Sequence, residues 1–290
     1  MKFWQTVSWS EADQLAEIAQ HAEELGFHGI LISDHILCPA EMRSRYPYSE
    51  NGSPPMNADW PHLDCWTAIA AMAAVTTRIL FSTIIYILPL RHPIEVAKTT
   101  STLAAISGNR LILGAGVGWM REEFESLGVD FSTRGRRMNE AIAILRRLWT
   151  GDFVEHRGEF FHFPPIRIVP TPAKPIPIYT GGSSPIALKR AARMSDGWIG
   201  HGNTPEEAME VLDKLQALRV EAGREHLPFE TIVGLTGSSR DDTLKRLEER
   251  GMTGAVSYPF QYALGLNSSL KQKIELMERF SKQHIRETVL

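Results

Sequence analysis

A strand, a helix and a second strand follow one another in residues 79–115, which read ILFSTIIYILPLRHPIEVAKTTSTLAAISGNRLILGA. The apolar run Ile79–Ile87 predicts a strand buried on both faces, because it lacks the alternation of a half-exposed strand. Helical spacing over Ile94–Ile106 ends at Gly108, a typical residue just past a helix, and Arg110–Ala115 predicts the next strand. Such a unit is typical of a parallel sheet.

The same alternation extends in both directions along the chain. Further strands are predicted at Phe3–Ser8, His28–Ser33, Ile178–Thr180, Gly197–Gly200, Thr231–Leu235 and Gly254–Tyr258. Further helices are predicted in a segment capped by Ser10 and ended by Gly26, and at Leu63–Val75, Arg136–Leu148, Pro185–Met194, Glu206–Ala222, Thr243–Arg250 and Leu270–His284. Eight strands and eight helices with right-handed crossovers predict a single (β/α)₈ TIM barrel over residues 1–290, with a doubly wound open sheet as the alternative.

Two segments fall outside this alternation. Residues 34–61 form a polar, proline-rich insertion, and loops of this length inside a domain are commonly functional, so a lid is expected here. Val154–Phe163 alternates apolar and polar residues around Arg157-Gly158, which predicts a β-hairpin.

The composition and charge exclude several classes of protein. The 290 residues are 43% hydrophobic and 22% charged, which is ordinary for a globular domain. A net charge of −3 gives no reason to expect a nucleic-acid partner or a membrane surface. The two cysteines, Cys38 and Cys65, are too few for a disulfide framework and favour a cytoplasmic setting. Because the histidines lack zinc-site spacing, no metal is expected.

Function in such a barrel resides in the loops that follow the strands, and four of these loops carry suitable residues. Ser33-Asp34-His35 offers an imidazole beside a carboxylate, and residues 82–93 follow an apolar strand. The glycines of Gly114–Trp119 permit close approach of a flat ligand, and Thr180–Pro185 offers N–H groups to an anion. Each of three segments has an alternative interpretation that needs no ligand. Ser33–His35 and Thr180–Pro185 are alternatively helix caps, the latter through Ser183 or Ser184. Residues 82–93 alternatively pack in the core.

Together these loops resemble the bacterial luciferase-like family of flavin and deazaflavin oxidoreductases. The matching segments lie within about residues 10–200 and include Ser33–His35, Leu90–Pro93, Ile106–Leu111, Gly114–Trp119, Glu122–Phe124, Arg134–Arg137, Leu148–Gly151, Gly181–Ser183 and Asp196–Trp198. Gly-Val-Gly-Trp followed by Glu-Glu-Phe most resembles the branch that uses the deazaflavin coenzyme F420. The resemblance implies a (β/α)₈ barrel with the cofactor ring at its C-terminal mouth.

The resemblance also implies roles for individual residues. Asp34 would contact the polar edge of the ring and His35 the reacting centre. The bulge at Thr83-Ile84 would contain a non-prolyl cis peptide bond that backs the ring. The other implied cofactor contacts are those of Gly116, Val117, Gly118 and Trp119 along the cofactor's side chain, and those of Gly181, Gly182 and Ser183 at its phosphate.

One position departs from the family pattern. Trp119 stands where the sugar-phosphate dehydrogenases of this branch carry a catalytic glutamate. Their acid–base pair is therefore not transferable, and sugar-phosphate oxidation is not the favoured reaction. Glu122 and Glu123 lie nearby, but we interpret them as the first turn of a helix, where negative charge is favourable.

The favoured function is hydride transfer between coenzyme F420 and a small organic substrate, with His35 moving the accompanying proton or orienting the substrate. Trp4, Trp9 and Trp60 would form the rim of the substrate pocket. The alternatives are an FMN-dependent two-component monooxygenase and a non-catalytic barrel without a cofactor. The expected partners are a small-molecule substrate, a second copy of the chain in a homodimer, and a separate reductase that recycles the cofactor.

Overall fold

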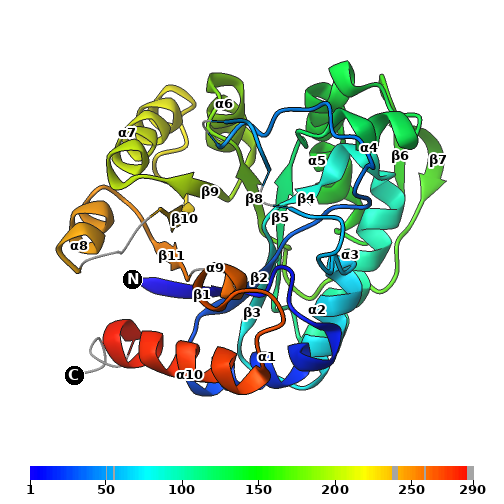
Figure 1. The fold of residues 1–290 in the computed structure, drawn as a ribbon. Helices are drawn as coiled ribbons and strands as arrows, with labels where there is room; N and C mark the ends of the chain where they lie inside the picture. The colour runs from blue at the N-terminus through cyan, green and yellow to red at the C-terminus, as the bar shows by residue number, and fades with distance from the viewer. Residues whose placement is uncertain (50, 55, 237–240, 258, 286–290) are drawn as a thin grey trace.

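Eight parallel strand positions close into a barrel, which confirms the predicted (β/α)₈ fold (Figure 1). The computed structural model describes residues 1–49, 51–54, 56–236, 241–257 and 259–285. Hydrogen bonding between β3 and β5 completes the ring of strands. The barrel strands are β1 (Lys2–Thr6), β2 (Gly29–Ile32), β3 (Leu80–Thr83), β4 (Tyr86–Ile87), β5 (Leu111–Gly116), β8 (Ile178–Gly181), β9 (Gly197–Asn203), β10 (Glu230–Leu235) and β11 (Gly254–Val256). These nine strands fill eight positions, because β3 and β4 follow one another along β5 and share one position.

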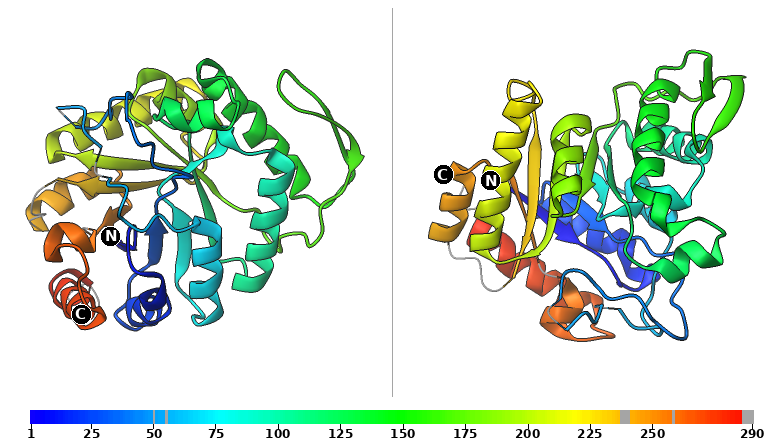
Figure 2. Two further views of the ribbon diagram at one scale, coloured as in Figure 1. Left: turned by 45° about the vertical axis from the view of Figure 1, so that its right-hand side comes forward. Right: turned by 90° about the horizontal axis from the view of Figure 1, so that it is seen from above.

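Helices cover the outside of the barrel (Figures 1 and 2). They are α1 (Leu15–Glu24), α2 (Cys65–Ala74), α3 (Pro93–Ser107), α5 (Arg134–Leu148), α6 (Pro185–Met194), α7 (Pro205–Glu221), α8 (Asp241–Glu249) and α10 (Leu270–Phe280). The short helices α4 (Arg121–Ser126) and α9 (Phe260–Leu264) lie in the loops that follow β5 and β11. Short helical turns lie at Ala12–Gln14, Leu88–Leu90, Phe131–Thr133 and Ser281–Ile285. Among the described residues, no helix combines the length and the apolar character needed to cross a membrane.

The predicted hairpin is confirmed as β6 (Val154–Arg157) paired antiparallel with β7 (His162–Ile166), and it projects away from the barrel (Figure 2). Gly108 also ends α3 in the left-handed conformation, as predicted. The helix start predicted at Glu122 and Glu123 is confirmed as the first turn of α4, whereas α9 was not predicted, because a helix of five residues carries too little periodicity. The predicted strand end at Tyr258 lies outside the described residues, as do Glu50 and Pro55 of the insertion.

The prediction that Ser10 caps the first helix was wrong. The chain turns at Trp9, which has a left-handed φ of 61°, and the Ser10 N–H donates to the Val7 carbonyl at 3.1 Å. A 3₁₀ turn then precedes α1, so the α-helix begins at Leu15 rather than directly after Ser10.

The strand predicted over Ile79–Ile87 is interrupted. A cis peptide bond joins Ile84 to Ile85, between β3 and β4, so the predicted position at Thr83-Ile84 was wrong by one residue. Thr83 still pairs with Ile32 in the ladder, and its hydroxyl donates to the Gly114 carbonyl at 2.7 Å. The strand is therefore regular through Thr83, and the irregularity comes only after it.

Large side chains fill the barrel interior. Trp4 is 2% exposed and packs with Tyr179, Ile199 and Ile232 from other strands. Gly29 makes room for Trp4, because a Cβ at Gly29 would lie 2.1 Å from that ring. The prediction that Trp4 lines the substrate rim was therefore wrong, since the alternation of side chains along β1 turns Trp4 into the barrel.

Candidate active site

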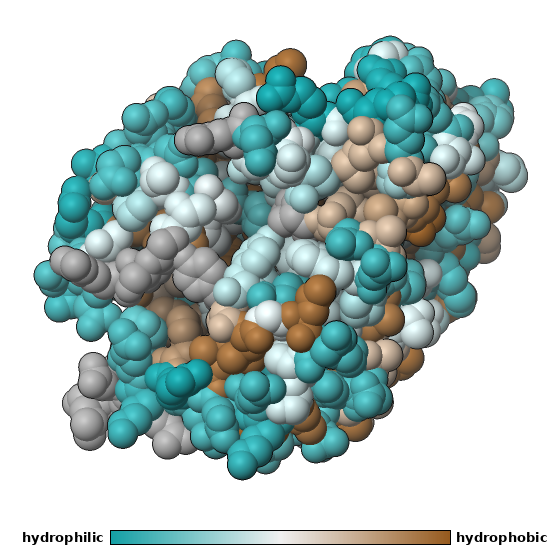
Figure 3. All heavy atoms as spheres, in the orientation of Figure 1, coloured by the Kyte–Doolittle hydropathy of each residue, from teal (hydrophilic) through white to brown (hydrophobic). Residues whose placement is uncertain are grey.

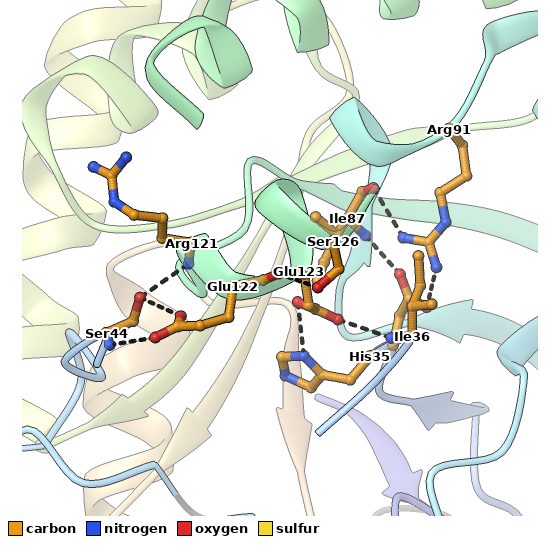
Figure 4. Close-up of polar contacts among 10 residues, drawn as sticks. His35, Ile36, Ser44, Ile87, Arg91, Arg121, Glu122, Glu123 and Ser126 are labelled. Carbon is orange, nitrogen blue, oxygen red and sulfur yellow. Dashed lines mark hydrogen bonds and ion pairs between the residues drawn. The ribbon is translucent and has the colours of Figure 1, made fainter. Parts of the chain in front are cut away.

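His35 and Glu123 form a hydrogen-bonded pair at the carboxyl edge of the barrel (Figure 4). His35 follows β2, and Glu123 lies on α4, which follows β5. The His35 Nδ1 lies 3.2 Å from Glu123 Oε2, and the Ile36 N–H donates to Glu123 Oε1 at 2.8 Å. Glu123 is fully buried, whereas the His35 side chain is 16% exposed. The carboxylate thus fixes one nitrogen of an imidazole that solvent still reaches.

Asp34 is committed to partners within the protein. Its carboxylate accepts from the Ile87 N–H at 2.8 Å and from the Arg91 guanidinium at 2.7 Å. Burial raises the pKa of Asp34, although Arg91 and the Ile87 N–H both act in the opposite direction. Arg91 also donates to the Ile87 carbonyl and lies over the Tyr86 ring. Asp34 therefore holds β4, directly after the cis bond, against the end of β2.

The Ile84-Ile85 segment lies at the end of the barrel core. Both side chains are half-buried and pack on the cluster that contains Trp4 and Tyr179. A Cβ at Gly116 or Gly181 would lie 2.0 or 2.5 Å from Ile85 Cδ1. The absence of side chains at these two glycines therefore allows Ile85 to lie between β5 and β8.

The loop after β8 is held by a hydrogen bond from Trp198 and exposes Ser183 to solvent. The Trp198 indole N–H donates to the Gly182 carbonyl at 2.9 Å, and Gly182 has a left-handed φ of 101°. Ser184 caps α6 by accepting from the Ala187 N–H, while Ser183 is exposed. The capping alternative therefore applies to Ser184, and Ser183 is free of that role.

The insertion after β2 crosses this edge of the barrel. Trp119 makes edge contacts with His35 and with Tyr46 of the insertion, at centroid distances of 5.9 and 5.2 Å. Farther along, Tyr48 contacts His201 at the end of β9. In Figure 1 this blue loop passes close to α4 and α6. The insertion thus reaches from His35 to the opposite side of the barrel.

A family model described as luciferase-like monooxygenase matches residues 3–284. The chain belongs to this family. It is 39% identical to an uncharacterised protein of Mycobacterium tuberculosis over 271 residues, which cover 92% of this chain and 93% of the relative. It is 29% identical to an F420-dependent glucose-6-phosphate dehydrogenase of Nakamurella multipartita over 269 residues, covering 90% of this chain and 74% of the relative.

A solved structure with the same fold is the monooxygenase RslO1 of Streptomyces bottropensis. Its TM-score is 0.78 at 18% identity, with 99% of this chain and 100% of that chain covered. Together with the family match, this likeness establishes a luciferase-like barrel. The family consists of flavin- and deazaflavin-dependent oxidoreductases, and this chain is one of its members.

Two residues of this luciferase-like site were missed by sequence reasoning. Glu123 had been assigned to favourable charge at a helix start, yet it contacts His35. His62 lies 5.9 Å from the His35 ring and 6.4 Å from the Trp9 ring, and burial, reinforced by His35, lowers the pKa of His62 to about 4. No local motif marks His62; the adjacent acids Glu122-Glu123 after a glycine-rich turn were the only signal for Glu123.

Glu122 anchors the insertion on the neighbouring face of α4 (Figure 4). It accepts from the N–H groups of Arg43 and Ser44 at 2.6 and 2.9 Å and from the Ser44 hydroxyl at 2.6 Å. Burial by itself would raise the pKa of Glu122, but these hydrogen bonds outweigh it and lower the pKa from 4.5 to about 2. The carboxylate therefore stays ionised and bound under most conditions.

We expect Glu122→Gln to loosen the insertion. The amide keeps one acceptor oxygen but loses the charge, and hydrogen bonds to charged groups are the stronger ones. Limited proteolysis at pH 7 should cut residues 40–49 at least about threefold faster than in the unmodified chain. The reason is that the variant loses the stabilisation of roughly one hydrogen bond between the insertion and α4. Glu125→Gln is the matched control, because the Glu125 carboxylate binds only the exposed Arg43 guanidinium within the described part of the chain.

The same contact has a defined pH dependence. Because the pKa of Glu122 is depressed in the folded chain, its stabilisation is complete above pH 4.5 and is lost as the pH falls toward 2. The hydrogen-exchange protection of residues 43–44, taken relative to the intrinsic exchange rate at each pH, should fall over that window in the unmodified chain and not in Glu122→Gln. An equal fall in both proteins would contradict the anchoring role.

Proposed function

We propose that this protein transfers a hydride between the deazaflavin coenzyme F420 and a small organic substrate. The His35–Glu123 pair carries the proposal, because it holds an accessible imidazole at the carboxyl edge of the barrel, where the resemblance to the family predicts the cofactor ring. The similarity to an F420-dependent dehydrogenase over 90% of the chain supports the choice of coenzyme. Oxidation of a sugar phosphate is not proposed, since Trp119 replaces the glutamate used there.

The residues present fit a planar ring with an anionic tail. Half-buried Ile84 and Ile85 provide an apolar surface at the end of the core, and the Ile84 N–H donates to the carbonyl of Ile32, three residues before His35. Exposed Ser183, before the first turn of α6, provides a polar end for a phosphate. When bound, the deazaflavin would supply the hydride-transferring carbon. Gly116, Gly118 and Trp119 would lie along the tail.

The protein's own groups would handle the proton. Glu123 accepts from the Nδ1–H of His35, which selects the tautomer with its proton on Nδ1. The unprotonated Nε2 then faces away from the carboxylate. That nitrogen would exchange the proton that accompanies hydride transfer at the substrate oxygen. The insertion, anchored through Glu122, would exclude water from the reacting atoms. A separate reductase would regenerate the coenzyme, and two copies of the chain would form the working unit.

A side-by-side titration with F420 and FMN tests the coenzyme. We expect F420 to bind at least tenfold more tightly, a difference of about 1.4 kcal/mol, as measured by cofactor fluorescence. Tighter binding of FMN would favour the two-component monooxygenase instead. Binding of neither would favour a barrel without a cofactor.

Two glycine variants test the proposed phosphate position, one as the test and the other as its control. Gly182→Ala places a Cβ 3.0 Å from the Ala187 Cβ in the loop before α6, at a φ of 101°. Gly223→Ala meets a similarly left-handed backbone, with φ of 65°, far from the mouth and with open space around it. Affinity for the coenzyme should fall about tenfold in the first variant only; an equal fall in both would show a general loss of stability.

A further inference from the structure

Three arginines from α4, α5 and α6 lie close together beside the insertion. Arg121 begins α4, Arg134 begins α5, and Arg190 lies on α6. The guanidinium carbons of Arg121 and Arg134 lie 4.5 and 3.8 Å from the centroid of the Phe131 ring. The Arg190 guanidinium donates to the carbonyl of Gly135, the residue after Arg134, at 3.4 Å. These three side chains form the arginine cluster.

Within the described part of the chain, none of the three guanidinium groups forms an ion pair or a hydrogen bond to a carboxylate. Arg190 is 7% exposed, and the Asn139 side-chain oxygen, a neutral acceptor, lies 2.6 Å from its Nε. Arg134 donates to the Phe131 carbonyl at 2.9 Å. The Arg121 side chain points away from the carboxylates of α4 (Figure 4). The cluster therefore carries positive charge that the described residues leave without a paired carboxylate.

The like charges of the cluster repel one another. Burial, reinforced by Arg121, lowers the pKa of Arg134, and burial, reinforced by Arg134, lowers the pKa of Arg190. Asp130, an exposed acid in the loop before α5, interacts with Arg121, but its two oxygens accept from Ser132. Such a cluster is stabilised when an anion joins it, and arginine forks match the oxygens of carboxylates and phosphates.

Other arginines near the insertion and on α5 have carboxylate partners. The pairs are Arg43 with Glu125, Arg91 with Asp34, and Arg136 with Glu159. In Figure 3, hydrophilic atoms gather at the upper right of the molecule, where Figure 1 places the green segments that include α5. A ligand of the cluster would therefore meet a polar surface, and the paired arginines would add little to its binding.

The cluster lies within reach of the proposed coenzyme site. The Arg121 N–H donates to the Ser44 hydroxyl of the insertion at 2.9 Å, and Arg121 follows Trp119 by two residues. Arg190 follows Ser183 by seven residues, which is about 10 Å along α6 at roughly 1.5 Å per residue. An amide-linked chain extends at most about 3.5 Å per unit, so about three units beyond the phosphate would span that distance.

We propose that the arginine cluster binds carboxylates, and that in the proposed reaction these are the glutamate carboxylates of the coenzyme tail. The inference rests on the proposed function, because it concerns the same coenzyme. Coenzyme F420 continues past its phosphate into amide-linked glutamates, whereas FMN ends at its phosphate. The cluster would therefore favour the deazaflavin over FMN, because only the deazaflavin brings carboxylates to the three cations.

A probe without a ring tests the cluster by itself. Titration of the ¹⁵N-labelled full chain with tri-γ-glutamate, without coenzyme, should shift the arginine Nε–H signals that Arg121→Met and Arg134→Met assign, and the shifts should saturate. Each variant should bind the peptide at least about tenfold more weakly, since charge-assisted hydrogen bonds are lost. Arg136→Met removes a cation that Glu159 already pairs, so this matched control should change the affinity less than about twofold.

Coenzyme forms with and without glutamates test the tail. By fluorescence titration, the form with several glutamates should bind about tenfold more tightly than the phosphorylated form that lacks them, and Arg121→Met should remove the difference. The proposal is overturned if the peptide does not bind, if inorganic phosphate binds more tightly than the peptide, if Arg136→Met weakens binding equally, or if the glutamates add no affinity. Peptide binding at the cluster without any coenzyme binding would reject the proposed function and support the carboxylate site.

Discussion

His35→Asn is expected to lower kcat about 10²- to 10⁴-fold, the usual contribution of a positioned general acid or base. Asparagine retains a polar group of similar reach but cannot exchange a proton near neutral pH. Coenzyme affinity should change less than threefold, because the side chain would act on the proton and not on the phosphate end of the cofactor. Both values follow from steady-state kinetics, with a substrate found by screening, and from fluorescence titration.

Glu123→Gln tests whether Glu123 positions His35 for catalysis or only stabilises the fold. Glutamine can still accept from the Ile36 N–H but no longer carries the charge that orders His35, so kcat should fall about tenfold or more while KM changes little. Glu125→Gln on the same helix, at an exposed carboxylate, is the control. If His35→Asn retains the full kcat, or if Glu123→Gln affects only the melting temperature, His35 is not the proton-transferring residue.

Arg91→Met is expected to produce the largest loss of stability. It leaves the buried Asp34 carboxylate without its cation, and breaking such a buried pair costs about 3–5 kcal/mol. The side chains of Asp34 and Arg91 are 4% and 15% exposed, so water screens them poorly. The free energy of unfolding at pH 7, obtained from urea titration, measures the effect.

Two comparisons make this prediction specific. Arg136→Met removes an exposed ion pair with Glu159 and should cost less than about 1 kcal/mol. The double variant Asp34→Asn/Arg91→Met should recover part of the loss, because no uncompensated charge remains buried. A single variant as stable as the Arg136 control would show that the Asp34–Arg91 pair contributes little to the fold.

Most elements were predictable because their signals are local. Pro185–Met194 has the same bounds in the prediction and in the structure, since Ser184 caps it, Pro185 suits its first turn, and its apolar face is regular. By contrast, the Ser10 prediction failed because Trp9 adopts a left-handed turn that no neighbouring residue indicates.

The candidate site was only partly predictable. His35 and the glycine loops could be named from the residues that follow each strand. Glu123 was assigned to a local role, because acidic residues at helix starts are common and its partner lies 88 positions away in the sequence. Trp4 was placed at the rim, since its apolar character does not tell which face of β1 it occupies.

The order of strands and helices along this chain follows from periodicity and capping over neighbouring residues, and it predicts a barrel with its reactive loops at one end, with an open sheet as the alternative. The His35–Glu123 pair, the commitment of Asp34 to Arg91 and the arginine cluster depend on the closed barrel itself. The physical reason is that hydrogen bonding and burial act between atoms in contact, and ring closure brings together residues that are far apart in the sequence.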